Sequence, residues 1–237
     1  MEKEQRELVK EECLLEGRPC RVFLCGSGPL LFWGVQSRSA ESCDALAEAL
    51  ARSRNLFTLV AFETQDWNAE LSPWQAPPAF GSDGFAGRGR ETLDWLERAC
   101  RASSLQDGEA RLRFLGGYSL SGLFSLWTLY ESRLFSGAAC CSGSLWFPGW
   151  GDYANNRTLP KDSLLYLSLG KKEEHTRNRV MATVGEQTRK QAALASEQLE
   201  SGRFTLHWEE GGHFSEPTRR LLRGFEWLLS AEKRECD

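Results

Sequence analysis

The sequence predicts one α/β domain over residues 1–237, with a mostly parallel central sheet, flanking helices and antiparallel strands at its amino-terminal edge. Segments with the apolar pattern of strands alternate with segments of helical period along most of the chain, and this alternation is typical of parallel sheets with crossover helices. With 237 residues, of which 41% are hydrophobic, the chain is long and apolar enough to bury one sizeable core.

The first third of the chain contains short strand patterns separated by turn residues. Residues 26–29 (GSGP) are expected to form a hairpin turn between the second and third strands. A loop rich in proline, glycine and aromatic residues is expected from residue 63 to about 88, and a loop this long is more often functional than idle. The elements expected here are strands around 11–15, 20–25, 30–34 and 56–62 and a helix over 42–52.

The rest of the chain continues the alternation. Residues 111–115 alternate as a strand does, and the apolar residues of 123–130 recur at helical spacing. Because the carboxyl ends of parallel strands meet at one edge of a sheet, residues directly after the strands are expected to form the site. The remaining elements are helices around 92–96, over 190–199 and over 219–231, and strands over 135–142, over 163–170 and near 206.

One serine lies in the turn between strand 111–115 and the helix after it. Residues 117–122 read GYSLSG. In a nucleophile elbow the serine occupies a strained turn, so the residues two before and two or three after it must have almost no side chain. Gly117, Ser121 and Gly122 fill these places, with Ser121 where the motif has glycine. We predict Ser119 as a nucleophile; the alternative is a Gly/Ser turn in an ordinary strand-to-helix connection.

A base is expected to follow the serine along the chain. Of the three histidines, His213 comes after a strand pattern and two glycines, in a loop from which an imidazole can project over the sheet edge. His207 lies inside the strand pattern and is interpreted as a structural or surface residue, and His175 as a solvated one. A neutral imidazole can take the hydroxyl proton and return it to the leaving group, so we predict His213 as the base.

An acid is expected after the penultimate strand, where residues 171–174 (KKEE) follow Gly170. A carboxylate here would orient the imidazole and stabilise its cation. Glu173, three residues beyond the glycine, is the first candidate and Glu174 the second. The alternative interpretation is a solvated Lys/Glu turn.

Two backbone N–H groups are needed to bind the oxyanion that develops on a carbonyl substrate. Leu120, directly after the serine, is predicted to supply the first. Val35 is predicted to supply the second, from a turn that Gly34 permits at the end of the third strand; the alternative is a strand end packed beneath the helix.

Aromatic residues are dense in the two loops near the expected site. Trp67 and Trp74 lie in loop 63–88, with Phe80 and Phe85, and Trp146 follows strand 135–142 together with Phe147 and Trp150. Aromatic walls favour aryl or acyl groups, so Trp146, Trp67 and Trp74 are predicted to bind substrate. The same side chains could instead pack the long loop against the sheet.

Composition excludes several classes of protein. The chain carries 33 acidic and 29 basic residues, and a net charge of −4 gives no general attraction to nucleic acid or to an anionic membrane. A charged amino terminus and the absence of a long apolar run predict a cytoplasmic protein without a membrane span. Its eight cysteines show no paired metal spacing and are expected to be free thiols, so no metal is predicted.

The motifs together resemble the esterase branch of the α/β-hydrolase superfamily, which includes feruloyl, S-formylglutathione and siderophore esterases, and a subgroup of bacterial hydrolases. The resemblance spans nearly the whole chain and rests on residues 66–68 (DWN), 72–74 (SPW), 117–122, 141–146 (CSGSLW) and 211–214 (GGHF). It implies the α/β-hydrolase fold and a cofactor-free hydrolase. It also implies Ser119 as nucleophile, His213 as base and Glu173 in the acid position.

The expected activity is hydrolysis of a small or aryl carboxylic ester through an acyl-enzyme, with a small-molecule ester as substrate. Two departures from the family pattern are Ser121 in the elbow and a glutamate where aspartate is commoner. The alternatives are an acyltransferase on the same fold and a catalytically silent binding protein. A fluorophosphonate probe labels an active serine, so it distinguishes an esterase or acyltransferase from a catalytically silent binding protein.

Overall fold

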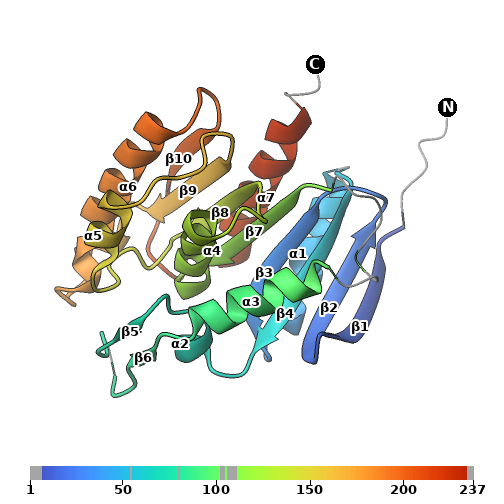
Figure 1. Cartoon of the computed structure of the whole chain (residues 1–237), viewed down its shortest axis with the longest axis horizontal. Helices are drawn as coiled ribbons and strands as arrows, with labels where there is room; N and C mark the ends of the chain where they lie inside the picture. The colour runs from blue at the N-terminus through green and yellow to red at the C-terminus, as the bar shows by residue number, and fades with distance from the viewer. Residues whose placement is uncertain (1–6, 54, 80, 102–104, 106–110, 234–237) are drawn as a thin grey trace.

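The structure is a computed structural model that describes residues 7–53, 55–79, 81–101, 105 and 111–233. Its centre is an eight-stranded sheet in the order β1-β2-β4-β3-β7-β8-β9-β10 (Figure 1). The pairs β1–β2 and β2–β4 are antiparallel and the other neighbours run parallel. The strands are β1 (Val9–Leu15), β2 (Arg18–Cys25), β3 (Leu30–Gln36), β4 (Phe57–Thr64), β7 (Arg113–Tyr118), β8 (Gly137–Cys141), β9 (Leu164–Gly170) and β10 (Phe204–Glu209).

Helices cover both faces of the sheet, which confirms the predicted fold class. One face packs against α1 and α7 through residues such as Leu46 and Phe225, and the other against α3, α4, α5 and α6 through residues such as Leu96, Phe124 and Trp150. Figure 1 shows α1 and α7 on the far side of the sheet from α3 and α4. The helices are α1 (Ala40–Arg52), α2 (Trp67–Glu70), α3 (Gly89–Ala99), α4 (Leu120–Glu131), α5 (Trp150–Asn155), α6 (Val184–Gln198) and α7 (Pro217–Lys233), with short 3₁₀ helices η2 (Glu173–His175) and η3 (Met181–Thr183).

The hairpin predicted at residues 26–29 is wrong. β2 and β3 are not neighbours, because the strongly apolar β4 lies between them and pairs with both. The connection instead crosses the end of β4, where a side chain at Gly28 would begin 2.2 Å from the carbonyl oxygen of Leu56. The glycines therefore serve a close crossing over β4, and the hairpin is the one between β1 and β2.

The predicted loop 63–88 contains short regular elements. These are α2 and a two-stranded sheet of β5 (Gln75–Ala76) and β6 (Phe85–Ala86). The Asp66 carboxylate caps α2 by accepting from the Ala69 amide at 3.0 Å. Phe80 lies outside the described residues.

Within the part of the chain that the structure describes, no helix is long and apolar enough to cross a membrane. The seven cysteines found there are all free, as predicted. Cys236 and the charged segment of residues 1–6 lie outside it.

Candidate active site

Ser119 occupies a strained turn between β7 and α4. Its backbone has φ 60° and ψ −122°, a combination that non-glycine residues rarely adopt, and it stands at the N-cap of α4. A side chain at Gly117 would begin 2.2 Å from the backbone of Ser121, and one at Gly122 would begin 3.0 Å from the Gly117 carbonyl oxygen. The glycines thus make room for a turn that lifts the serine to the carboxyl edge of the sheet.

Ser121 fits this turn although the motif has glycine in its place. The residue is fully buried and its hydroxyl donates to the carbonyl oxygen of Gly34 at 3.1 Å. The elbow is therefore joined to the end of β3 by a hydrogen bond that glycine could not make.

A continuous chain of hydrogen bonds links three of the predicted residues. Ser119 Oγ lies 3.0 Å from His213 Nε2, and His213 Nδ1 lies 2.7 Å from Glu173 Oε2. The three residues follow β7, β10 and β9, so the carboxyl edge of the sheet brings together groups that are 94 and 40 residues apart along the chain.

Electrostatics fixes the direction of these hydrogen bonds. Burial acts to raise the pKa of Glu173, but hydrogen bonds from His213, Ser142 and the Gly170 amide, with the charge of His213, hold it below the ordinary glutamate value. An ionised carboxylate only accepts hydrogen bonds, so Nδ1 of His213 carries a proton. In the neutral imidazole Nε2 is then free to accept the Ser119 hydroxyl.

The other candidates for base and acid lie elsewhere. Glu174 turns away and forms a two-pronged ion pair with Arg189 at 2.8 and 2.9 Å. His207 is exposed on β10, 3.8 Å from Glu209, and His175 is exposed at the end of η2. None of these contacts Ser119 or His213 in the described residues.

Arg220 and Tyr118 were not singled out from the sequence, yet both hold the site. The guanidinium of Arg220 is buried and donates to Glu173 Oε1 at 2.8 Å. It also donates to the carbonyl oxygens of Glu210 and Gly212, at 2.9 and 3.0 Å, in the loop that carries His213. The Tyr118 hydroxyl donates to the His213 carbonyl oxygen.

The two predicted oxyanion donors occupy different kinds of position. Leu120 is the first residue of α4, so its N–H has no acceptor within the helix. Val35 does not lie in a turn: β3 continues to Gln36, and the Val35 carbonyl accepts from Thr64 Oγ1 at 3.0 Å. The predicted turn at Gly34 is wrong, because that glycine provides space instead, with a side chain there beginning 2.9 Å from the Phe62 ring.

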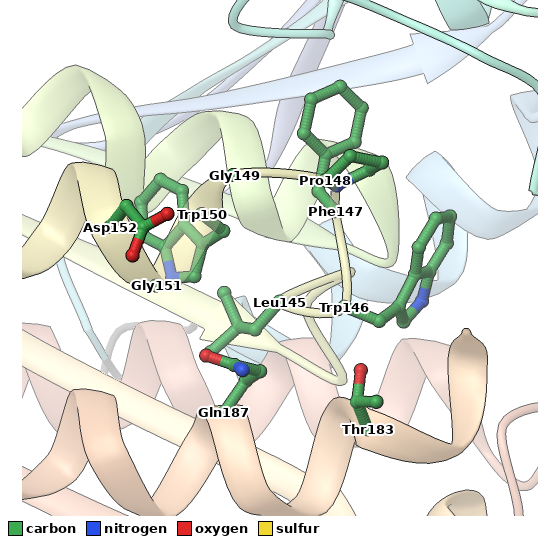
Figure 2. A pocket seen from close by; sticks show the side chains of 10 residues that line it. All are labelled: Leu145, Trp146, Phe147, Pro148, Gly149, Trp150, Gly151, Asp152, Thr183 and Gln187. Carbon is green, nitrogen blue, oxygen red and sulfur yellow. The ribbon is translucent and has the colours of Figure 1, made fainter. Parts of the chain in front are cut away.

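A cavity of about 210 Å³ lies in the loop after β8. The loop begins beside Ser119, since the Ser144 amide donates to the Ser119 carbonyl oxygen at 3.0 Å and the two hydroxyl oxygens are 3.4 Å apart. Figure 2 shows the loop segment 145–151 facing Thr183 and Gln187 across the opening, with the Trp146 side chain at one end and Trp150 at the other.

Of the three aromatic residues predicted to bind substrate, Trp146 lines this cavity, together with Phe147 and Trp150, whereas Trp67 and Trp74 are not among its lining residues. Trp74 supports the same loop from outside: its indole N–H donates to the Pro148 carbonyl oxygen at 2.9 Å, and its ring packs on Phe147 and Tyr153. Trp67 is half-buried in α2 against the core. Among the described residues, no group of three or more His, Cys, Asp or Glu side chains could hold a metal ion.

Comparison with known proteins gives the fold independently. No family model and no curated protein sequence matches the chain. Among solved structures, the siderophore hydrolase EstA from Aspergillus nidulans is 18% identical, with 95% of each chain covered and a TM-score of 0.66. An IroE-like serine hydrolase from Shewanella oneidensis is 16% identical, with 94% of this chain and 80% of that one covered and a TM-score of 0.74.

The enterobactin esterase FES from Shigella flexneri, whose crystal structure was determined in the presence of 2,3-dihydroxy-N-benzoylglycine, is 15% identical and has a TM-score of 0.66. The match covers 96% of this chain and 60% of that one. With the strand order described above, these similarities show that the chain has the α/β-hydrolase fold, as the sequence predicts.

Proposed function

We propose that this α/β-hydrolase-fold protein is a serine esterase, which hydrolyses a small-molecule carboxylic ester through an acyl-enzyme. The observation that carries the proposal is the unbroken chain Ser119 Oγ, His213 Nε2, His213 Nδ1 and Glu173 Oε2, at 3.0 and 2.7 Å. The similarity in fold to solved hydrolases and esterases supports the proposal, as does the resemblance of the sequence motifs to the esterase branch.

In the proposed first half-reaction, Ser119 Oγ attacks the ester carbonyl carbon while its proton passes to Nε2 of His213. The tetrahedral intermediate then collapses, the bond to the leaving oxygen breaks, and the same proton is returned to that oxygen as the alcohol departs. Water repeats the sequence on the acyl-enzyme and releases the acid. Glu173 stays ionised throughout and stabilises the imidazolium that forms in each half.

The negative charge on the former carbonyl oxygen needs preorganised donors. We assign the Leu120 amide as one, because it is the first N–H of α4 and also feels the positive end of the helix dipole. Val35, the second donor predicted from the sequence, does not fit this role: its carbonyl accepts from Thr64 on β4, and in a strand the N–H and C=O of one residue point to the same side, so its N–H faces β4 and not the elbow.

The acyl group is proposed to be small or aryl. The cavity that Trp146 lines holds about 210 Å³, and an engineered apolar cavity of about 150 Å³ in another protein accepts benzene, so a substituted single ring matches this volume. The structure of FES, determined in the presence of the aromatic compound 2,3-dihydroxy-N-benzoylglycine, supports an aromatic group in the substrate. Trp67 and Trp74 do not line the cavity, but Trp74 supports its loop through the hydrogen bond to the Pro148 carbonyl oxygen.

The experiment that tests the proposal compares wild type, Ser119→Ala and Ser121→Ala. We expect a fluorophosphonate probe to label wild type and Ser121→Ala but not Ser119→Ala, and p-nitrophenyl acetate hydrolysis to follow the labelling. Unchanged turnover by folded Ser119→Ala would overturn the proposal. Adding an alcohol to the assay identifies the acyltransferase alternative, because the acyl-enzyme would then react with the alcohol faster than with water.

A further inference from the structure

The most highly connected charged side chain beside the triad is one that takes no part in the chemistry described above. Arg220 lies on α7 with 2% of its side chain exposed. Its Nη1 donates to Glu173 Oε1 at 2.8 Å and to Ser142 Oγ at 2.9 Å. Burying a guanidinium costs folding free energy unless it is paired with an anion and its N–H groups find acceptors. The contacts of Arg220 with Glu173 and Ser142 offset this cost.

The same guanidinium holds the loop that carries the base. Its Nη2 donates to two carbonyl oxygens, of Glu210 and of Gly212, on either side of Gly211 and directly before His213. The planar fork of arginine reaches the acid with one nitrogen and this loop with the other, which a lysine ammonium cannot reproduce. One side chain therefore fixes the distance between the acid and the base.

The surroundings leave no space for a looser arrangement. A side chain at Gly170 would begin within 3 Å of the Gly211 carbonyl oxygen, the Glu173 carboxylate and Arg220 Nη1. The Tyr118 hydroxyl, which holds the His213 carbonyl oxygen, lies 3.3 Å from the same Nη1. The backbone of β9, the histidine loop and β7 thus converge on the guanidinium.

We propose that Arg220 is a positioning residue of the active site, which clamps Glu173 to the His213 loop and sets, by its positive charge, how readily the imidazole accepts a proton. The proposal rests on the proposed esterase function. The cation partly offsets the negative charge of Glu173 as seen from His213, which favours the neutral imidazole that a general base must have.

The other charged and titratable groups near His213 do not supply this effect. On β7, burial raises the pKa of Tyr118 to about 12, so its hydroxyl stays neutral at working pH. Around the histidine loop, Lys171 pairs with Glu210, Arg219 with Glu216, and Arg223 with Glu209, which also lies near His207. The hydrogen bond from Lys171, together with the charge of the exposed Lys172, lowers the pKa of Glu210. Behind it, burial raises the pKa of the Cys141 thiol, which donates to the Arg220 carbonyl oxygen, to about 12.

The test uses three variants of the full chain: Arg220→Gln, which removes the charge and keeps one donor group, Arg220→Lys, which keeps the charge and removes the fork, and Arg223→Gln as a control on the same helix. For Arg220→Gln we expect kcat to fall about 10- to 100-fold and KM to change by less than about twofold. We also expect the acid limb of the plot of kcat/KM against pH to shift to higher pH by about one unit. For Arg220→Lys we expect a fall in kcat with the limb unmoved. Arg223→Gln is expected to match wild type in both respects.

A second measurement does not depend on activity. In the Ser119→Ala background, NMR titration of the imidazole of His213, assigned by loss of its signal in His213→Ala, is expected to move to higher pH with Arg220→Gln and to stay in place with Arg220→Lys. A folded Ser119→Ala/Arg220→Gln protein whose His213 titrates as in Ser119→Ala alone overturns the proposal. Absence of esterase activity in wild type refutes the proposed function and leaves this titration to decide the role of the charge.

Discussion

Replacing Glu173 by glutamine would remove the negative charge and change almost nothing in volume, so its effect reports the role of the acid. Glu173 Oε1 accepts hydrogen bonds from three donors, the Ser142 hydroxyl, the Gly170 amide and Arg220 Nη1, all at 2.8 Å. A glutamine must therefore place its carbonyl oxygen there, because its NH₂ group would face three donors in the opposite orientation. The NH₂ group is then directed at Nδ1 of His213.

This orientation selects the wrong tautomer of the base. Facing an NH₂ donor, Nδ1 of His213 must act as acceptor, so the proton moves to Nε2, which can no longer receive the proton of Ser119. In chymotrypsin-like proteases the corresponding change, aspartate to asparagine, lowers kcat about 10⁴-fold. We expect a loss of roughly 10³- to 10⁴-fold here, equivalent to about 4 to 5.5 kcal/mol of activation free energy.

The assay is kcat and KM for p-nitrophenyl acetate at pH 7.5, with circular dichroism to establish that each variant is folded. Glu174→Gln is the matched control. Glu174 forms an ion pair with Arg189 on the surface, so we expect its replacement to change kcat little. A folded Glu173→Gln protein with kcat within tenfold of wild type would refute the reasoning and indicate a serine–histidine pair. A large loss at Glu174 alone would refute the assignment of the acid.

Four further outcomes are expected. Ser119→Gly should be more stable than Ser119→Ala by about 1 kcal/mol in urea unfolding, because glycine relieves the backbone strain at φ 60°, and both should be inactive; equal stabilities would refute the strain argument. His213→Ala should lose at least about 10³-fold in kcat and His207→Ala less than about threefold, and the reverse order would move the base into β10. Trp146→Ala should lower kcat/KM for p-nitrophenyl benzoate about tenfold relative to the acetate, and an unchanged ratio would exclude Trp146 from the acyl site. Because the pKa of Glu173 is lowered on folding, its ionised form stabilises the fold above the unfolded-state pKa, and this contribution is lost as pH falls through the lower folded-state pKa; urea titrations between pH 7 and 3 should show a smaller loss of stability for Glu173→Gln than for wild type.

Local sequence patterns predicted most of the fold and the three residues that the structure joins by hydrogen bonds, Ser119, His213 and Glu173. The elbow could be predicted because the strained turn demands small residues at fixed offsets from Ser119, and the structure places Gly117 and Gly122 against backbone atoms. The choice of Glu173 over Glu174 rested on spacing alone, and the structure distinguishes them physically, by a buried carboxylate on one side and a surface ion pair on the other.

The features that sequence could not supply depend on contacts distant along the chain. The hairpin at residues 26–29 failed because turn residues do not reveal that β4, more than 25 residues later, takes the position between two consecutive strands. Arg220 stands between Arg219 and Arg223 in the sequence, and nothing in their spacing says that only one of the three points into the site. Its partners are 47 and 102 residues away.

The order of the site along the chain also has a consequence for biosynthesis. Ser119 is translated 94 residues before His213, and α7, which packs on β7, β8 and β9 and brings Arg220 to the acid, is made after both. While the residues after 119 are still being synthesised, Ser119 therefore lacks the partner that it contacts in the folded chain, because His213 follows it by 94 residues. Docking of α7 on β7, β8 and β9 then brings Arg220 to Glu173, so the packing of this helix and the arrangement of the site are coupled in folding.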